Sequence, residues 1–162
     1  MTDDLFSVKG KVALVTGGTS GIGTMIARGF VRRGVKTYIA SRDQARSDAA
    51  AAELAAEGGV CIGLEADLAT PDGPAALAAA LGQHEDRLDI LVNNAGANNR
   101  ATIETMDMAG WDDVLNVNLR GVFFLTQQVL PLLRAAGTAD SPARIINIGS
   151  IGGLHIPNWE AH

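Results

Sequence analysis

The hydrophobic and polar positions of the chain fall into two alternating patterns. Short runs rich in Val, Ile, Leu and Ala are typical of strands buried on both faces of a parallel sheet, and they occupy residues 11–16, 35–40, 60–64, 88–92 and 144–148. Between them, apolar residues recur at helical spacing, from residue 22 up to Gly34 and over residues 42–57, 71–81 and 111–133. The sequence therefore predicts a strand–helix alternation through most of its length.

Glycine and proline mark several of the predicted helix ends. Gly34 ends the first helix, and the Gly58-Gly59 pair ends the second. A proline falls near the first turn of the helix over residues 71–81, and we expect Pro131 to kink or shorten the helix over residues 111–133.

Strands that alternate with helices pair in parallel through right-handed crossovers. We therefore expect the α/β class, with a Rossmann-like, doubly wound parallel sheet of strand order 3-2-1-4-5. The length of 162 residues and the hydrophobic content of 47% predict a single domain over residues 1–162. Residues 150–162 have no period and read as a loop, so the apolar last strand is expected to leave an exposed edge. The sheet is predicted to be C-terminally incomplete.

Charge and cysteine content narrow the class of protein. The formal net charge is -5 and the charged residues are scattered, which predicts no general attraction to nucleic acid or to anionic membranes. Cys61 is the only cysteine and lies in an apolar run, so it favours a reducing, cytoplasmic location and a buried structural thiol. Asp3 and Asp4, without a long apolar stretch, argue against a signal peptide, and no later run is long enough for a membrane span.

A glycine-rich turn joins the first predicted strand to the first helix. Residues 16–23 read Thr-Gly-Gly-Thr-Ser-Gly-Ile-Gly. Glycine lets a backbone turn sharply and approach a ligand closely, and a helix N-terminus offers free N–H groups to a pyrophosphate. The turn is a candidate dinucleotide cradle, although ordinary tight turns also use glycines.

Four motifs occur together in this chain. They are the Thr-Gly-x-x-x-Gly-x-Gly turn, Asn93-Asn94-Ala95-Gly96 after the fourth strand, Asn118 within Asn-Val-Asn-Leu, and Ser150 after Ile-Asn-Ile-Gly. In this order and context they resemble the classical short-chain dehydrogenases/reductases, and in particular the 3-oxoacyl carrier-protein reductase type, including its rhamnolipid-pathway relatives. The resemblance implies an oxidoreductase that transfers hydride between a nicotinamide cofactor and a small-molecule ketone or secondary alcohol, such as a 3-oxoacyl thioester. It also implies a homo-oligomer for the full-length protein.

The resemblance assigns cofactor contacts to the glycine turn and to the second strand. Gly17, Gly21 and Gly23 would form the turn, and Thr19, Ser20 and Ile22 would contact the phosphates and the adenosine ribose. Where NAD-preferring relatives carry an acid after the second strand, this chain has Ser41 followed by Arg42. A guanidinium can bind a 2′-phosphate, so we expect NADP(H), with NAD(H) as the alternative. Arg42 could instead be a solvated residue in the first turn of a helix.

Further assigned contacts follow the third and fourth strands. Asp67, with Leu68, matches the family position that meets the adenine amino group, and its alternative is a helix N-terminal cap. Asn94, Ala95 and Gly96 would line the ribose side of the cofactor, whereas Asn93 would brace the sheet.

Two catalytic residues are implied, and two others are absent. Asn118 would hold a water in a proton relay, and Ser150 would hydrogen-bond the substrate carbonyl or developing alkoxide. The family's Tyr-x-x-x-Lys motif does not occur in these 162 residues, and the only tyrosine, Tyr38, falls on the second strand, where it cannot substitute. Two interpretations stay open: a fragment of a reductase, or a nucleotide-binding module that is catalytically silent by itself.

The histidines carry no assigned chemistry. His155 and His162, with Trp159, are expected to be packing or surface residues of the last loop. His84 has no metal-ligand partners nearby, so no metal site is predicted.

Overall fold

The computed structural model describes residues 6–151. It contains a five-stranded parallel sheet in the order β3-β2-β1-β4-β5, which confirms the predicted topology. The strands are β1 (Val12–Thr16), β2 (Lys36–Ser41), β3 (Cys61–Glu65), β4 (Ile90–Asn93) and β5 (Arg144–Asn147). The helices are α1 (Gly21–Val31), α2 (Gln44–Ala55), α3 (Gly73–Gly82), α4 (Met108–Leu115) and α5 (Val122–Ala136), and a π-helical turn, η2 (Asn116–Gly121), joins α4 to α5. The predictions for Asp3, Asp4, His155, Trp159 and His162 lie outside the described residues.

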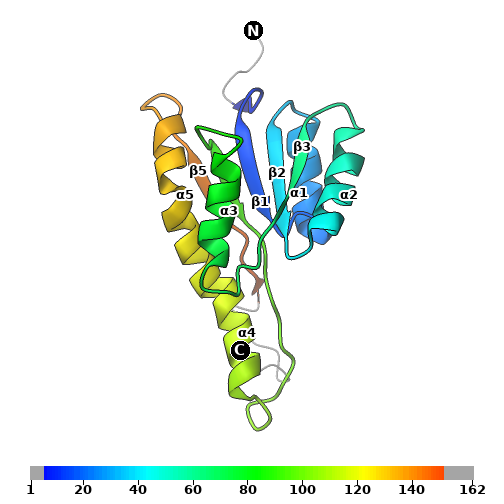
Figure 1. Ribbon diagram of the computed structural model, residues 1–162, viewed down its shortest axis with the longest axis vertical. Helices are drawn as coiled ribbons and strands as arrows, with labels where there is room; N and C mark the ends of the chain where they lie inside the picture. The colour runs from blue at the N-terminus through cyan, green and yellow to red at the C-terminus, as the bar shows by residue number, and fades with distance from the viewer. Residues whose placement is uncertain (1–5, 152–162) are drawn as a thin grey trace.

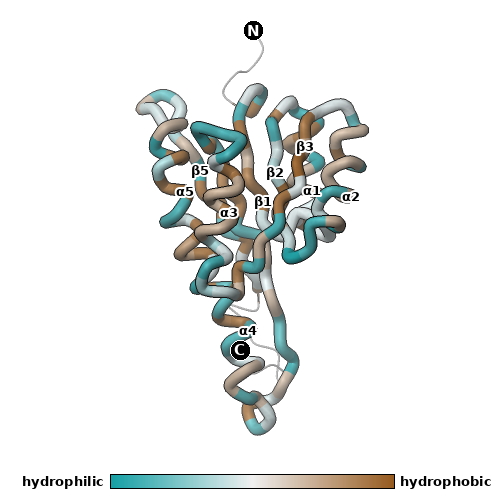
Figure 2. Tube along the Cα trace, viewed as in Figure 1, coloured by the Kyte–Doolittle hydropathy of each residue, from teal (hydrophilic) through white to brown (hydrophobic). Residues whose placement is uncertain are grey.

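Helices cover both faces of the sheet (Figure 1). On β1, Leu14 belongs to a core cluster with α3 and α5, whereas Val15 belongs to a second cluster with α1 and α2. This alternation follows from the two-residue period of a strand. Figure 2 shows hydrophobic residues along the strands and more hydrophilic ones in many of the connecting turns. Helix α4 lies beyond the carboxyl ends of the strands, at the end of the domain where those strands finish (Figure 1).

Two predicted helices begin later than expected. Helix α2 begins at Gln44 rather than at residue 42, because Asp43 is extended and its side chain accepts the Arg46 N–H as an N-terminal cap. Helix α3 begins at Gly73, so Pro74 is the proline in its first turn.

The expectation that Pro131 shortens its helix is wrong. Helix α5 continues to Ala136, with Pro131 inside it. Proline removes a hydrogen bond to the carbonyl four residues earlier, which belongs to Gln127. Both residues are exposed, so water can meet that carbonyl. The predicted helix over residues 111–133 is in fact two α-helices with a π-turn between them.

The exposed edge predicted at the last strand is present. All four residues of β5 are exposed, and Ile145 and Ile146 keep 46% and 42% of their surface accessible. Among the described residues, strand β5 pairs only with β4.

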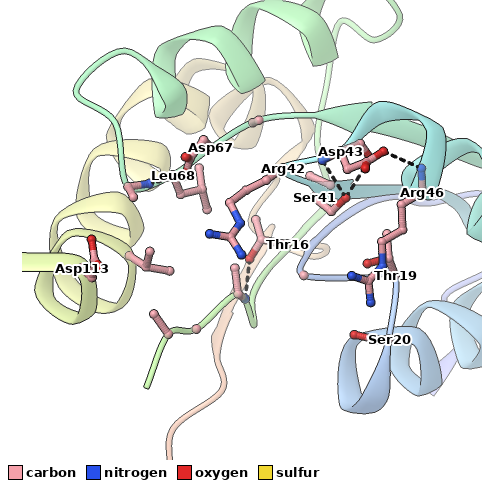
Figure 3. Close-up of a pocket in the computed structure, with 18 of the residues that line it drawn as sticks. Thr16, Thr19, Ser20, Ser41, Arg42, Asp43, Arg46, Asp67, Leu68 and Asp113 are labelled. Atoms are coloured by element: carbon pink, nitrogen blue, oxygen red, sulfur yellow. Dashed lines mark hydrogen bonds between the residues drawn. The ribbon is translucent and has the colours of Figure 1, made fainter. Parts of the chain in front are cut away.

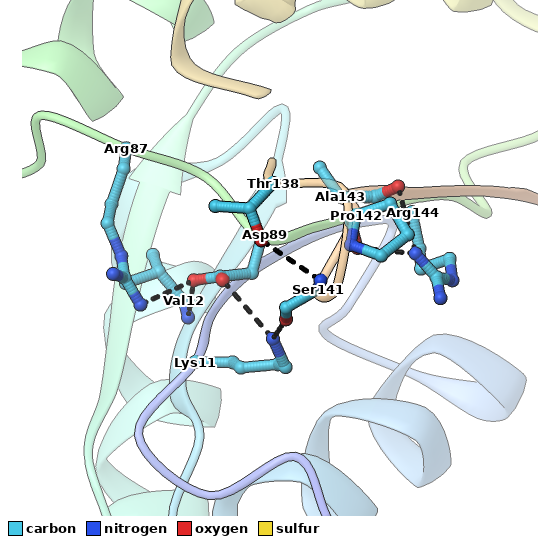
Figure 4. A network of polar contacts seen from close by, with 9 residues as sticks. All are labelled: Lys11, Val12, Arg87, Asp89, Thr138, Ser141, Pro142, Ala143 and Arg144. Atoms are coloured by element: carbon cyan, nitrogen blue, oxygen red, sulfur yellow. Dashed lines mark hydrogen bonds and ion pairs between the residues drawn. The ribbon is translucent and has the colours of Figure 1, made fainter. Parts of the chain in front are cut away.

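A buried carboxylate connects the amino ends of the two central strands (Figure 4). Asp89, just before β4, is 5% exposed and accepts the Val12 N–H at 2.9 Å. Arg87 and Lys11 approach the same carboxylate at 3.1 and 3.5 Å, and Lys11 also donates to Ser141. This network fixes β1, β4 and the chain before β5 at the sheet edge opposite the carboxyl ends.

Cys61 has the environment of a structural thiol. It is partly buried against the core cluster beneath α1 and α2. Burial raises its pKa to about 11, so the reactive thiolate is scarce near neutral pH.

Tyr38 is a core residue that lies away from the carboxyl edge of the sheet. Its side chain is fully buried, and its hydroxyl donates to Glu85 Oε1 at 2.7 Å. Lys36 Nζ lies 2.5 Å from the same oxygen. Burial, followed by the Glu85 hydrogen bond, raises the pKa of Tyr38 to about 12. A buried tyrosine with a raised pKa is unsuited to proton transfer, in agreement with the sequence prediction.

The raised pKa of Tyr38 can be tested directly because the chain has a single tyrosine. Titration of the tyrosinate absorbance should give a midpoint near pH 12 in the folded protein and near 10.0 in urea. A pKa raised on folding adds stability that is complete below the unfolded pKa and is lost as pH rises through the folded pKa. The contribution of Tyr38 should therefore persist below pH 10.0 and vanish toward pH 12. A native midpoint near pH 10.0 contradicts the packing described here.

Candidate functional site

A pocket of about 740 Å³ lies at the carboxyl ends of β1 to β4 (Figure 3). In open α/β sheets, ligands bind at this edge, where the strand order reverses. The pocket brings together residues from all four strand ends, and those that the sequence predicted are Gly17, Thr19, Ser20, Ser41, Arg42, Asp67, Leu68, Ala95 and Gly96.

The glycine turn at the pocket wall depends on close backbone approach. Gly17 has a φ of 64° and packs against Asn94 and Ala95. A Cβ atom at Gly23 would lie 2.2 Å from the Gly17 carbonyl oxygen and 2.5 Å from Asn94 Nδ2. Gly21 has a φ of 54° and faces open space. The positive φ angles therefore favour glycine at Gly17 and Gly21, and the close packing excludes a side chain at Gly23. Gly21, Ile22 and Gly23 do not line the pocket.

Two side chains fasten this turn to the end of β4. Thr16 Oγ1 accepts the N–H groups of Asn94 and Ala95, each at 3.0 Å. The Asn94 amide donates to the carbonyls of Thr16 at 2.9 Å and Gly17 at 3.2 Å. Asn94 thus shapes the turn and does not itself line the pocket.

Asn93 braces the sheet, as predicted. It is 4% exposed, and its Nδ2 donates to Thr126 of α5 at 3.2 Å and to Asn147 of β5 at 2.9 Å. These hydrogen bonds connect β4 to its neighbouring strand and to the helix that covers it.

The amino end of α1 is open toward the pocket. Ser20, its N-cap residue, has an extended backbone and makes no capping hydrogen bond with its side chain. The first-turn N–H groups of a helix carry partial positive charge and have no partner within the helix. Thr24 Oγ1 donates to the Gly18 carbonyl at 2.9 Å, which holds the turn against the helix. This arrangement suits an anionic ligand.

Two guanidinium groups line the pocket beside the end of β2 (Figure 3). Arg42 is exposed and precedes the Asp43 cap, so only its expected place in the first turn of α2 is wrong. Arg46 lies in that first turn and lines the same pocket, and sequence reasoning missed it. Among the described residues neither guanidinium takes part in an ion pair.

The Ser41 hydroxyl stabilises the turn that carries Arg42. It lies 2.8 Å from Ser47 Oγ and donates to the Asp43 carbonyl at 3.1 Å. Ser41 lines the pocket and replaces an acid at the end of β2 without adding negative charge.

Asp67 lines the pocket from the loop after β3. Its Oδ1 accepts the Ala69 N–H at 3.0 Å. The N-cap residue of α3 is Asp72, so the alternative of Asp67 as a helix cap is wrong. Its contact with adenine stays a prediction.

Asn118 lies in η2 and pairs with the backbone of Ala97. Its Oδ1 accepts the Ala97 N–H at 2.7 Å, and its Nδ2 donates to the Ala97 carbonyl at 2.9 Å. π-Turns within helices are frequent at functional sites. The pairing fixes the loop after β4, while the predicted proton-relay role of Asn118 stays untested.

Ser150 lies just past the end of β5 and is exposed. The pairing of β5 with β4 continues to Ile148, whose N–H donates to the Asn93 carbonyl at 2.9 Å. Ser150 is therefore at the same edge of the sheet as the pocket, although it does not line it. Its catalytic role stays a prediction.

Over residues 6–151, no cluster of three or more His, Cys, Asp or Glu side chains could hold a metal ion. Within the same part of the chain, no helix is both long and apolar enough to span a membrane.

Comparisons with known proteins agree with this geometry. The sequence model of the short chain dehydrogenase family matches residues 11–161. The rhamnolipids biosynthesis 3-oxoacyl-[acyl-carrier-protein] reductase of Pseudomonas aeruginosa is 45% identical over 157 residues, which are 97% of this chain and 61% of the relative. Gluconate 5-dehydrogenase of Gluconobacter oxydans is 34% identical, over 91% of this chain and 56% of the relative. The chain thus spans less than two thirds of the length of these relatives.

A solved structure shows the same fold. The Pseudomonas aeruginosa RhlG/NADP active-site complex superimposes with a TM-score of 0.91 at 44% identity, covering 97% of this chain and 61% of that one.

Proposed function

The chain belongs to the short-chain dehydrogenase family, and from that membership we propose that its pocket binds NADP(H) in preference to NAD(H). The observation that carries this proposal is the pair of arginines, Arg42 and Arg46, that line the pocket beside the end of β2 without ion-pair partners among the described residues. The 2′-phosphate of NADP(H) can form charge-assisted hydrogen bonds with these guanidinium groups.

The residues of the pocket fit the cofactor. The glycine turn and the open amino end of α1 would hold the pyrophosphate. Asp67 and Leu68 would contact the adenine, and Ala95 and Gly96 would line the ribose. NADP appears in the RhlG complex and in a metagenomic short-chain oxidoreductase complex at 34% identity, which supports the same ligand here.

We further propose that the whole protein is an oxidoreductase acting on a ketone or secondary alcohol such as a 3-oxoacyl thioester. The 3-oxoacyl reductase relative supports this class. Bound NADP(H) would supply the hydride. Ser150 would hydrogen-bond the carbonyl oxygen, and Asn118 would hold a water for proton relay. The protein would be a homo-oligomer in the cytoplasm.

A polypeptide of these 162 residues is proposed to bind nucleotide without turnover. Its only tyrosine, Tyr38, is buried in the core and has its pKa raised to about 12. Hydride transfer to a carbonyl also needs a proton at the oxygen, and the family's Tyr-x-x-x-Lys motif does not occur in these residues.

The test follows NADPH absorbance after mixing the 162-residue polypeptide with a 3-oxoacyl thioester. We expect no consumption of NADPH, together with nucleotide binding by calorimetry. If NADPH consumption persists in purified protein and disappears in Ser150→Ala, the proposal that the polypeptide has no turnover is overturned. The matched control is Ser141→Ala, which removes a hydroxyl from the opposite edge of the sheet.

A further inference from the structure

The π-turn η2 touches two loops on different sides of the pocket. Residues 66–69 follow β3, residues 95–97 follow β4, and both groups line the pocket. Asn118 holds the second loop through both backbone groups of Ala97. The same short turn also reaches the first loop.

Two residues of η2 make this second contact. The Arg120 guanidinium donates to the Ala69 carbonyl oxygen. Gly121 is buried, and a Cβ atom there would lie 2.7 Å from the Leu68 carbonyl oxygen. Backbone therefore meets backbone at this point, with the Arg120 hydrogen bond beside it.

The loop that Arg120 contacts, residues 67–69, is held by contacts on two sides. Asp67 Oδ1 bonds the Ala69 N–H within the loop. On its far side, α3 approaches so closely that a Cβ at Gly73 would lie 1.8 Å from the Asp67 carbonyl oxygen. The loop is thus held between the amino end of α3 and the η2 turn.

We propose that Arg120 is a positioning residue for nucleotide binding, because it holds the Asp67–Leu68–Ala69 loop in the conformation that receives the adenine end. This inference rests on the proposed NADP(H) site. Arg120 does not line the pocket, so it acts through Ala69 rather than by touching the ligand. Apparent affinity falls in proportion to the fraction of protein in the competent conformation.

The experiment compares Arg120→Ala with Arg134→Ala in the purified protein. Arg134 is exposed in the last turn of α5, the helix that follows η2, so its replacement removes the same charge at a position away from the loop. The probe is adenosine 2′,5′-bisphosphate, the adenine half of NADP. Calorimetry should show binding about ten-fold weaker for Arg120→Ala, the effect of losing one charge-assisted hydrogen bond. Arg134→Ala should match the wild type.

Two further readouts separate positioning from other effects. A purely electrostatic effect would fade at high salt, whereas the ten-fold ratio between variant and wild type should persist. Hydrogen exchange of the unliganded protein should be faster at residues 67–70 in Arg120→Ala and unchanged in Arg134→Ala.

The outcomes are distinct. If the wild type binds the probe, and Arg120→Ala has unchanged probe affinity and unchanged hydrogen exchange, the positioning role of Arg120 is overturned while the NADP(H) proposal stands. A ratio that disappears at high salt also overturns it. A wild type that does not bind the probe overturns the NADP(H) proposal on which the inference rests.

Discussion

Gly23→Ala should weaken nucleotide binding by about a hundred-fold or more and destabilise the protein. The added Cβ would lie 2.2 Å from the Gly17 carbonyl oxygen, so the turn and α1 must move apart. Overpacking of this kind costs about 1–3 kcal/mol. If the shift removes two charge-assisted hydrogen bonds to the pyrophosphate, affinity falls about a hundred-fold or more. Calorimetry with NADPH and urea unfolding measure the two effects.

Gly29→Ala is the matched control for this prediction. Gly29 lies in the same helix, and the nearest atom to an added Cβ is Arg33 Nη1 at 3.8 Å. Alanine in a helix interior is favoured over glycine by about 0.5–1 kcal/mol, so this variant should be slightly more stable and should bind normally. If Gly23→Ala bound NADPH as well as Gly29→Ala does, the described turn would not be the phosphate site.

The double variant Arg42→Ala/Arg46→Ala should lose NADPH affinity by about a hundred-fold, the effect of two hydrogen bonds to a charged group. NADH affinity should change only a few-fold, because NADH lacks the 2′-phosphate. Both arginines are exposed at the pocket wall, so the free energy of unfolding should stay within about 0.5 kcal/mol of the wild type.

The control for this double variant is Arg33→Ala/Arg134→Ala. It removes the same net charge from residues that do not line the pocket. Equal losses of NADPH and NADH affinity in the Arg42/Arg46 variant would show that these groups do not select the 2′-phosphate.

The sheet could be predicted from the sequence because its central strands are buried on both faces. Strands β1 and β4 are buried along their whole length, and the helices between the strands set the crossover connections. Helix starts were less accurate where a cap decides them, as at Asp43. The π-turn at Asn116–Gly121 was not predicted, because an extra residue in one turn hardly disturbs the hydrophobic period.

The candidate site was predicted from motifs more fully than from periodicity. The glycine motif located Gly17, and the family resemblance added Arg42 and Asp67; the structure brings all three to one pocket. The motifs did not reveal that Asn94 and Asn118 bind neighbouring backbone, since such contacts depend on the distance between loops far apart in sequence. Arg46 and Arg120 belong to no motif used here, and only the folded geometry relates them to the pocket.

The most direct test of the central claim is a calorimetric titration of the purified protein with NADPH and, separately, with NADH. The arginines beside β2 predict binding of NADPH at least about ten-fold tighter than binding of NADH, since one bond to the 2′-phosphate is worth that factor. Equal affinities, tighter NADH binding, or no binding of either nucleotide would contradict the proposed NADP(H) site.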